Sequence, residues 1–596
     1  MNNYKKDFQQ LIKGFSHINY NQDLTILTNQ QVWKDDNDFA NAFLDPSTYT
    51  TKRIRGKALF SQVEFDFEQT VIKKDSIEYE LSRIKTNNHQ VGYLLTTNAD
   101  EQLLIRTAEL INSNLFNNIV IMPDGHITKT NIVGFSAKAI KDQNGDPLLS
   151  PIIVGPDIGC GILSAHFNDA VFANQDLKQL LAAIDQGVVN LIPAGQAAEH
   201  NLETMIKGDW FANLFDHNYY QLVKNQVEKF LKATHFYHRL PTQEQLIMLN
   251  SIVANSGTLG DGNHFVEINQ DQDGKQILNI HSGSRNFGAI VYQYYQKLAK
   301  KQAHQDYQVL QKDYEEQVAN LKVQYQNQIL NQNQMQAAIK AAKQQLNQSK
   351  QLVNDGLYTL SGELALNYYH DLKIAQTYGA FNRELMIFVI SQYLKNVILK
   401  NPDLEVFNKK YHNVHNSIFK IADEYVLLKG TILGQVVNVT NDKDKIHPNT
   451  IALNMADGII STYPQYNHKN GANVNFALPH GAGRHQSRRA FYANNQKEKM
   501  NEFRNLMSDV ISSCVNFHTL DESPQAYKAK TDIIKQSAAL FRDDFQIWKP
   551  VYAFKGHRNL PFMQNRDLIK KANNNFYHKI RNQNQQSNTR SNIKQK

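Results

Sequence analysis

The chain has 596 residues, of which 41% are hydrophobic. This length exceeds that of an average single domain, and the composition allows a large buried core, which excludes a wholly disordered chain. Its two cysteines, Cys160 and Cys514, lie 354 positions apart, so a disulfide framework is excluded and a reducing compartment is favoured. The N-terminus has no apolar signal segment and no stretch is apolar enough to span a membrane, so we expect a cytoplasmic protein.

The positive charge is concentrated at one end of the chain. The formal net charge is +8, from 64 Lys and Arg against 56 Asp and Glu. Residues 556–596 contain nine basic residues and one acidic residue, so residues 1–555 are neutral overall. The end of this tail is rich in Asn, Gln and Ser, which is typical of disorder. We expect a solvated tail, the alternative being a mobile arm that binds polyanions and releases them as salt rises.

In chain order, residues 1–85 contain no motif with a clear chemical meaning and are treated as an N-terminal accessory region. From residue 86, β-rich runs such as NNIVIMP, NIVGFSAK, SPIIVG and QILNIHSGSR alternate with glycine turns and helical stretches such as DLKQLLAAI. This alternation predicts a core that mixes helices and strands. The apolar run VISSCVNF around Cys514 predicts a buried helical position.

A long polar segment interrupts this core. Residues 291–350 contain no Gly or Pro and 16 Gln, with apolar residues at irregular helical spacing. This pattern predicts a helical hairpin or imperfect coiled coil, which is more simply a solvated insertion than a partner-docking arm. The expected organisation is therefore an accessory region at 1–85, a core at 86–555 with an insertion at 291–353, and a basic tail at 556–596.

Four short segments place metal-binding residue types at strand ends or in glycine turns. They are VGPDIGCG with Asp157 and Cys160, GTLGDGNHFVEI with His264, LNIHSGSRNFG with His281, and NVHNSI with His415. A single histidine of this kind is more often packed or solvent-facing than a ligand. Together, however, these side chains can form two adjacent sites that share the sulfur. Thiolate and imidazole suit zinc, whereas the carboxylate and open positions also suit manganese, and paired ions can clamp phosphate oxygens during in-line displacement.

A fifth segment, FALPHGAGRHQSRRAF, combines a histidine with small and basic residues. These are His480, the small residues Gly481, Ala482 and Gly483, and the basic residues Arg484, Arg488 and Arg489. The small residues predict backbone N–H groups that face an anion, and the planar arginine fork suits phosphate. His480 is a candidate general acid, ligand or nucleophile toward a phosphoryl-type group. Standing alone, the segment would be interpreted as a basic surface turn.

These five segments, in this order, resemble the RtcB family of RNA-splicing ligases. Further matches are MPDGH at 122–126, KGT at 429–431, LNMADG at 453–458, LDESPQAYK at 520–528 and KPVYAFK at 549–555. The resemblance covers about 86–555 apart from the helical insertion, and it is closer to a bacterial and phage-like side branch. It implies an α+β fold, a single large catalytic domain with mixed sheets flanked by helices.

The resemblance also implies an activity and a set of site residues. The activity is the joining of RNA 3′-phosphate or 2′,3′-cyclic phosphate ends to 5′-hydroxyl ends, in RNA repair or tRNA splicing, with GTP and two Mn²⁺ as cofactors. His480 would carry a covalent guanylate, and an archease-like protein is an expected activator. The implied manganese ligands are Asp157, Cys160, His264, His281 and His415. Nucleotide contacts are implied for Asn263, Glu267, Asn416, Asn454, Gly481, Ala482, Gly483, Tyr527 and Lys555. Supporting contacts, or contacts to phosphate and RNA, are implied for Asp124, Arg285, Arg484 and Arg488.

The sequence departs from the family pattern at Thr128, Thr130, Leu428, Ala452 and Ile459. The threonines replace glycines of the family pattern. Leu427 and Leu428 replace His-Arg, which removes a phosphate-binding cation. The other two positions are commonly Pro and Ser. Two alternative functions remain: a two-metal phosphodiesterase or phosphatase that trims RNA ends, and a non-catalytic RNA-binding scaffold. A scaffold would have no use for the costly cluster of ligand-type residues.

Overall fold

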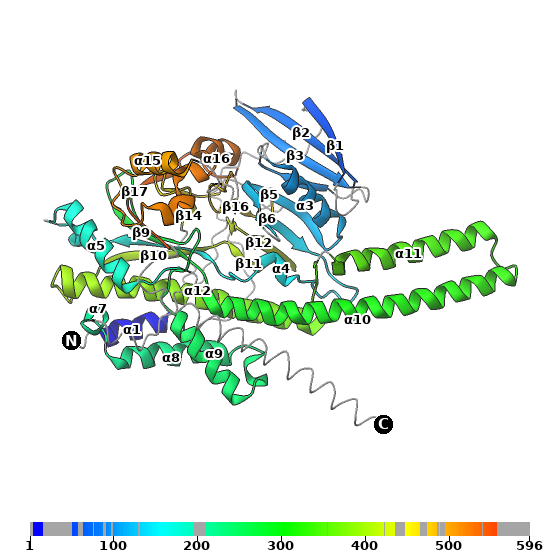
Figure 1. Cartoon of the computed structure of the whole chain (residues 1–596), viewed down its shortest axis with the longest axis horizontal. Helices are drawn as coiled ribbons and strands as arrows, with labels where there is room; N and C mark the ends of the chain where they lie inside the picture. The colour runs from blue at the N-terminus through cyan, green and yellow to red at the C-terminus, as the bar shows by residue number, and fades with distance from the viewer. Residues whose placement is uncertain are drawn as a thin grey trace.

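Figure 1 shows the protein as a computed structural model in which sheets and helices form one layered body. The structure describes residues 4–15, 50–57, 64–74, 77–86, 91–96, 99–128, 131–173, 175–195, 209–354, 356–421, 423–434, 447–464, 474–485, 488, 491, 495–538 and 540–556. The basic tail beyond 556, together with Thr130 and Arg489, lies outside these residues. The mixture of helices and sheets agrees with the α+β class expected from the sequence.

The first sheet has eight strands, and all neighbours are antiparallel except the parallel pair β4 and β5. In spatial order its strands are β1 (Thr50–Lys57), β2 (Glu64–Lys74), β3 (Ile77–Thr86), β4 (Val91–Leu94), β5 (Phe116–Ile127), β6 (Ile132–Ala139), β12 (Glu424–Lys429) and β11 (Asn416–Ile421). Strands β1 to β3 come from the region expected to be accessory. They extend the same hydrogen-bonded sheet as the core strands.

The second sheet has seven strands and is antiparallel throughout. In spatial order they are β10 (Phe407–Val414), β7 (Gly161–Phe167), β9 (Gln276–Ser282), β8 (Phe265–Gln270), β17 (Gln546–Lys555), β15 (Ile459–Thr462) and β14 (Asn449–Ala452). A two-stranded ladder of β13 (Thr431–Leu433) and β16 (Ala477–Pro479) completes the sheets.

Helix α12 (Gly362–Tyr393) is the central helix of the fold. Apolar residues occur on all its faces, as expected for a helix that is buried on every side. It packs against β7, β9 and β11 and against α1 (Tyr4–Lys13), α5 (Leu177–Leu191) and α8 (His217–Lys232). Further α-helices within the described residues are α3 (Glu101–Asn112), α4 (Pro151–Val154), α7 (Asp209–Ala212), α9 (Thr242–Asn255), α15 (Gln496–Leu506) and α16 (Lys530–Ser537). Short 3-10 turns cover Asp169–Val171, Tyr237–Arg239, Phe517–Glu522 and Pro524–Ala526, and a π-turn covers Leu394–Ile398.

Helices α10 (Arg285–Gln326) and α11 (Gln332–Asn354) occupy the range for which the sequence predicts a helical hairpin. Both extend away from the layered body, and only the first turns of α10 are buried (Figure 1). Apolar side chains near the far end stay in solvent, with Val323 51% and Ile329 67% exposed. Within the described residues, no helix has the length and apolarity that a membrane crossing requires.

Two local predictions are wrong. The SPIIVG run does not form a strand but contains α4, because Pro151 suits the first turn of a helix, where its missing N–H has no intrahelical partner. Cys514 is buried as expected, yet it lies in a turn after α15 and not in a helix. Its buried position reflects packing beside β17, since its thiol contacts the backbone oxygen of Lys555 at 3.4 Å.

Candidate metal and nucleotidyl-transfer site

The metal-type residues meet at one edge of the seven-stranded sheet. Four neighbouring strands run in alternating directions, so the end of one lies beside the start of the next. His415 follows β10, Cys160 precedes β7, His281 lies near the end of β9, and His264 precedes β8. The antiparallel register therefore gathers at one edge side chains that are up to 255 positions apart in sequence.

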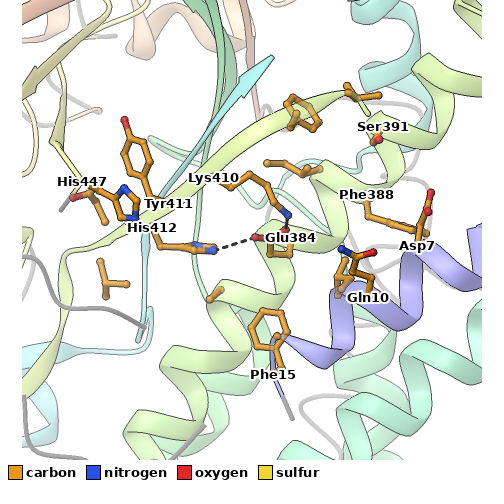
Figure 2. A pocket seen from close by; sticks show the side chains of 18 of the residues that line it. Asp7, Gln10, Phe15, Glu384, Phe388, Ser391, Lys410, Tyr411, His412 and His447 are labelled. Carbon is orange, nitrogen blue, oxygen red and sulfur yellow. Dashed lines mark hydrogen bonds and ion pairs between the residues drawn. The ribbon is translucent and has the colours of Figure 1, made fainter. Parts of the chain in front are cut away.

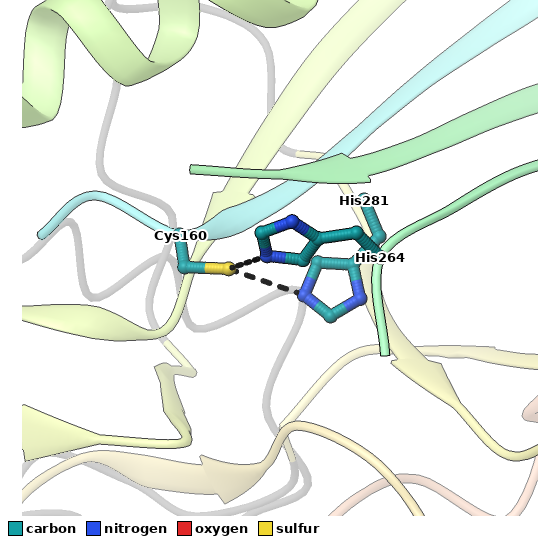
Figure 3. Close-up of side chains that lie close together, drawn as sticks. All are labelled: Cys160, His264 and His281. Carbon is teal, nitrogen blue, oxygen red and sulfur yellow. Dashed lines mark hydrogen bonds between the residues drawn. The ribbon is translucent and has the colours of Figure 1, made fainter. Parts of the chain in front are cut away.

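The donor atoms of Cys160, His264 and His281 all lie within 4.8 Å of one another, and with Asp157 and His415 they can be divided into two groups of three that share the Cys160 sulfur. In the first group, His264 Nε2 is 3.2 Å from Cys160 Sγ and 3.2 Å from Asp157 Oδ2. In the second, His281 Nε2 is 3.3 Å from Cys160 Sγ and 3.1 Å from His415 Nε2. Figure 3 shows the Cys160 sulfur facing both His264 and His281. The cysteine and the three histidines are buried, whereas the Asp157 side chain is 32% exposed and opens the cluster to solvent.

The spacing and ionisation of these groups fit a bound cation. Metal bonds of about 2.0–2.3 Å to nitrogen and sulfur separate neighbouring donor atoms by ~3.5 Å, close to the spacing found here. Burial, with the neighbouring histidines, lowers the pKa of His281 and His415 well below its usual value, so both imidazoles are in the neutral, metal-binding form. Burial and the Asp157 charge raise the pKa of the Cys160 thiol, and a cation at the sulfur would reverse that effect.

A glycine makes this convergence possible. Gly159, directly before Cys160, has a φ of +69°, and a Cβ there would lie 2.6 Å from the Gln376 Cα of α12. Only glycine tolerates both that dihedral and that close approach. The Gly159 N–H also donates to the backbone oxygen of Asn416 at 2.7 Å, which ties the turn to β11.

His480 lies beside the second group and is oriented by a buried carboxylate. Its ring centroid is 4.7 Å from that of His415. His480 Nδ1 lies 2.6 Å from Asp124 Oδ2, and the same oxygen accepts the backbone N–H groups of His480 and Gly481, each at 3.1 Å. Because Asp124 engages Nδ1, the other ring nitrogen is left to act as a nucleophile or a ligand.

The glycine-rich loop after His480 is packed against β5 and β14. Gly483 has a φ of +72°, and a Cβ there would lie 2.4 Å from the backbone oxygen of Asp124. The Gly481 N–H donates to Asp124 and the Ala482 N–H donates to Ala452 O. In this structure both N–H groups therefore donate to the protein itself, one to the Asp124 carboxylate and one to a backbone carbonyl. A nucleotide contact by Gly481, Ala482 or Gly483 through other atoms stays a prediction.

Glu522 is the centre of a buried charge cluster that the sequence interpretation missed. Its carboxylate contacts Lys555 at 3.2 Å, Arg484 at 3.5 Å, Arg488 and the Tyr527 hydroxyl. Burial raises the pKa of Glu522, but the nearby cations outweigh it and lower this pKa to about 2. The sequence feature that could have indicated Glu522 is the LDESPQAYK segment. In it, Glu522 precedes Tyr527, an implied nucleotide contact, by five positions.

The cluster brings together four of the residues implied to contact nucleotide, phosphate or RNA, namely Tyr527, Lys555, Arg484 and Arg488. The Arg484 guanidinium lies 5.2 Å from the centroid of the Tyr527 ring, and Lys555 lies 5.1 Å from that of Phe265, next to His264. Glu267, on the same strand as Phe265, is buried. Burial raises its pKa to about 7, against the opposing effects of its hydrogen bond from Asn269 and the Lys555 charge. Glu267 is therefore able to hold or release a proton near neutral pH.

The remaining candidate residues have different surroundings. Asn263 is exposed beside His264. Asn416 donates to Asp157 O at 3.1 Å and accepts the Gly430 N–H at 2.8 Å. Its amide therefore connects the turn that carries Asp157 to Gly430. Asn454 closes its own turn by accepting the N–H groups of residues 456 and 457. Arg285 begins α10 and donates to Thr258 Oγ1 at 3.3 Å.

The departures from the family pattern have local structural roles. The Thr128 hydroxyl donates to Asn131 O at 2.8 Å and so closes the turn between β5 and β6. The Ala452 N–H donates to His480 O at 3.1 Å, a bond that proline at this position could not make. Leu428 and Ile459 are fully buried in apolar clusters, so neither position presents a polar group to the site.

Arg383 is a second residue that the sequence interpretation missed. It lies fully buried on α12 and donates to Gly159 O at 2.9 Å and Ser282 O at 2.6 Å, one position from Cys160 and His281 respectively. Its Nε also contacts His412, which in turn contacts Glu384. His412 and Glu384 both line a cavity of about 610 Å³ (Figure 2). The sequence feature that could have indicated Arg383 is the charged pair Arg383 and Glu384 within an otherwise apolar stretch of α12. Fully buried charges are rare unless they are paired.

Replacing Arg383 with methionine is expected to loosen both ligand-bearing turns. The variant leaves two buried carbonyl oxygens without a charged donor, which should lower the free energy of unfolding by about 2–4 kcal/mol and reduce metal retention. Urea unfolding and metal content after dialysis measure the two effects. Lys312→Met, which removes an exposed helix-surface ion pair with Glu316, is the control and should cost no more than about 1 kcal/mol. Equal unfolding curves for the two variants would contradict the bracing role.

Comparison with known proteins identifies the family of this chain. A model of the protein family described as tRNA-splicing ligase RtcB matches residues 105–556, a range that contains both donor groups, His480 and the Glu522 cluster. The chain belongs to the RtcB family. Membership accounts for the joint presence of the five sequence segments that meet at the site.

Two RtcB proteins of known sequence are similar to part of this chain. RNA-splicing ligase RtcB of Escherichia coli (strain K12) is 28% identical over 218 residues, which make up 35% of this chain and 46% of that protein. RNA-splicing ligase RtcB1 of Escherichia coli (strain ATCC 25922) gives the same identity and coverage. The chain thus aligns with just under half the length of these RtcB relatives.

Proposed function

We propose that this RtcB-family protein is an RNA ligase that joins a 3′-phosphate or 2′,3′-cyclic phosphate end to a 5′-hydroxyl end, using GTP and manganese. The observation that carries the proposal is a buried cysteine shared by two groups of metal-type donors, next to a histidine whose Nδ1 is engaged by a carboxylate. The names of the E. coli relatives and the family description support the choice of RNA as substrate.

Asp157, Cys160 and His264 would hold one divalent ion, and Cys160, His281 and His415 the other. When bound, such ions hold phosphate oxygens in line and neutralise the charge that develops during transfer. The chain itself contributes the neutral imidazoles, the shared sulfur and the exposed Asp157 side, from which substrate phosphate would approach. The donor set suits zinc as well as manganese, and we assign manganese by analogy with the family.

His480 would act as the nucleophile toward GTP. Its free ring nitrogen attacks the α-phosphate, an N–P bond forms, and diphosphate leaves. A 2′,3′-cyclic phosphate end would first be opened by water, which breaks the bond to O2′ and leaves a 3′-phosphate. An oxygen of the RNA 3′-phosphate then displaces the histidine to give an RNA-pp-guanosine end. Finally the 5′-hydroxyl of the second RNA attacks that end, forming the phosphodiester and releasing GMP. Asp124 would orient the ring throughout by engaging Nδ1.

The Glu522 cluster would position the nucleotide and RNA phosphates. Arg484, Arg488 and Lys555 supply positive charge that the Glu522 carboxylate keeps in place, and Tyr527 supplies an aromatic face. Glu267 would accept or donate a proton near neutral pH. An archease-like activator remains part of the proposal and would be required if the purified chain guanylylates slowly.

A joining assay tests this function. A labelled RNA with a 3′-phosphate and a second RNA with a 5′-hydroxyl are incubated with the full chain, Mn²⁺ and GTP, and the products are separated by length. We expect a joined product that depends on both GTP and Mn²⁺, with ATP in place of GTP as the matched control. Loss of the terminal phosphate without joining, with or without GTP, would instead favour an end-trimming phosphodiesterase or phosphatase.

A further inference from the structure

A second cluster of metal-binding side chains lies far from the site described above. His235 follows α8, while His370 and Asp371 are consecutive residues of α12. His235 Nδ1 is 2.8 Å and His370 Nδ1 is 3.2 Å from the same carboxylate oxygen, Asp371 Oδ1. Asp371 and Arg383, which braces the first site, are twelve residues apart on one helix, a distance of about 18 Å along its axis.

The carboxylate in this cluster is buried and held from several sides. Asp371 is fully buried, and its Oδ2 accepts the Tyr295 hydroxyl of α10 at 2.7 Å. The backbone N–H of His235 donates to both carboxylate oxygens, at 3.0 and 3.2 Å. Among the described residues, the ion-pair partners of Asp371 are His235 and His370. Burial of a carboxylate is costly, and a cation held between Asp371 and the two imidazoles would compensate its charge.

The cluster also has the donor set and the access that a metal site needs. The candidate ligand atoms of the three residues all lie within 4.8 Å of one another. Two imidazoles and one carboxylate are a common ligand set for zinc and related divalent metals. The His235 side chain is 38% exposed, which leaves a path for the ion and room for water in an open coordination position.

We propose that His235, His370 and Asp371 form an additional binding site for a divalent transition metal of the zinc class. The ion would join the segment after α8 to α12, and through Tyr295 it would brace the base of α10, from which the helical hairpin extends (Figure 1). This site uses no residue of the proposed ligase centre, so its presence does not depend on the proposed function.

Zinc content measures the site directly. The full chain is stripped with a chelator, loaded with zinc, desalted and analysed by mass spectrometry for metal per chain. We expect the double variant His235→Ala/His370→Ala to hold one zinc fewer per chain than the wild type. His238→Ala is the matched control, because His238 lies on the same segment and contacts the backbone oxygen of Lys232 instead of Asp371. It should keep the wild-type content.

Cobalt loading separates a local loss from general unfolding. The Cys160 centre should give a thiolate-to-cobalt absorption band, which the double variant is expected to keep while it loses one equivalent of metal. Wild-type zinc content in the double variant would overturn the proposal. The three side chains would then be interpreted as a structural hydrogen-bond network. If the double variant loses the thiolate band, the single variant His235→Ala decides, since that side chain is partly exposed. Full zinc retention by this single variant likewise overturns the site.

Discussion

Replacing His480 with alanine is expected to abolish transfer of label from GTP, labelled at the α-phosphate, to the protein. The imidazole is the group that would form the N–P bond, and removal of a nucleophile typically lowers the rate by at least about 10³-fold. The measurement incubates wild type and variant with Mn²⁺ and labelled GTP, then follows protein-bound label that is stable to alkali and released by acid. Metal content should stay close to that of the wild type, because His480 belongs to neither donor group.

The matched control is His485→Ala, an exposed histidine five positions further along the chain. It should label like the wild type. Label of wild-type intensity on His480→Ala would falsify the nucleophile assignment. Absence of label on the wild type, despite bound metal, added RNA and an archease-like partner, would move the function toward hydrolytic trimming of RNA ends.

Replacing Cys160 with alanine is expected to remove both metal and activity. The sulfur contacts a histidine of each donor group, so its loss weakens two ion sites at once. Loss of a group that merely supports a ligand already costs about 10–100-fold in metal affinity, so loss of a shared ligand should exceed about 100-fold. Competition titration with a metal-binding dye measures the affinity, and the RNA joining assay measures the activity.

Cys514→Ala provides the thiol control for this experiment. Cys514 is equally buried but contacts the backbone of β17 rather than a histidine, so its variant should bind metal like the wild type. Metal occupancy of Cys160→Ala equal to that of Cys514→Ala would rule out the bridging role. The two donor groups would then have to be assigned to a single ion or to hydrogen bonding.

Much of the candidate site was predictable because its residue types carry their chemistry with them. A cysteine between glycines, histidines at strand ends and a histidine before Gly-Ala-Gly indicate metal and phosphate chemistry before any fold is known. Glu522 and Arg383 were not predictable in the same way. Each acts through partners distant in sequence, such as the 224 positions between Arg383 and Gly159, and no local spacing indicates such a pairing.

Local patterns failed where tertiary packing decides the conformation. The SPIIVG run has the composition of a strand, yet it forms a helical turn that ends at Gly155, and Lys429 of β12 donates to the backbone oxygen of Val154 in this turn at 2.8 Å. The loop after His480 contains the small residues typical of an anion site, but the neighbouring β14 and Asp124 take up its N–H groups. Intrinsic preference is weak compared with such long-range hydrogen bonds and burial.

The sequence by itself determined the α+β class, the family resemblance, the long helical segment and the residue types of the chemistry, because these depend on composition, periodicity and short motifs. Only the tertiary structure decided that the Cys160 sulfur contacts both His264 and His281, that Asp124 engages His480, and that His235 meets Asp371. These contacts depend on strand register and on the packing of α12, which bring together residues more than 100 positions apart. Such long-range contacts are a property of the folded chain as a whole and have no counterpart in any local segment.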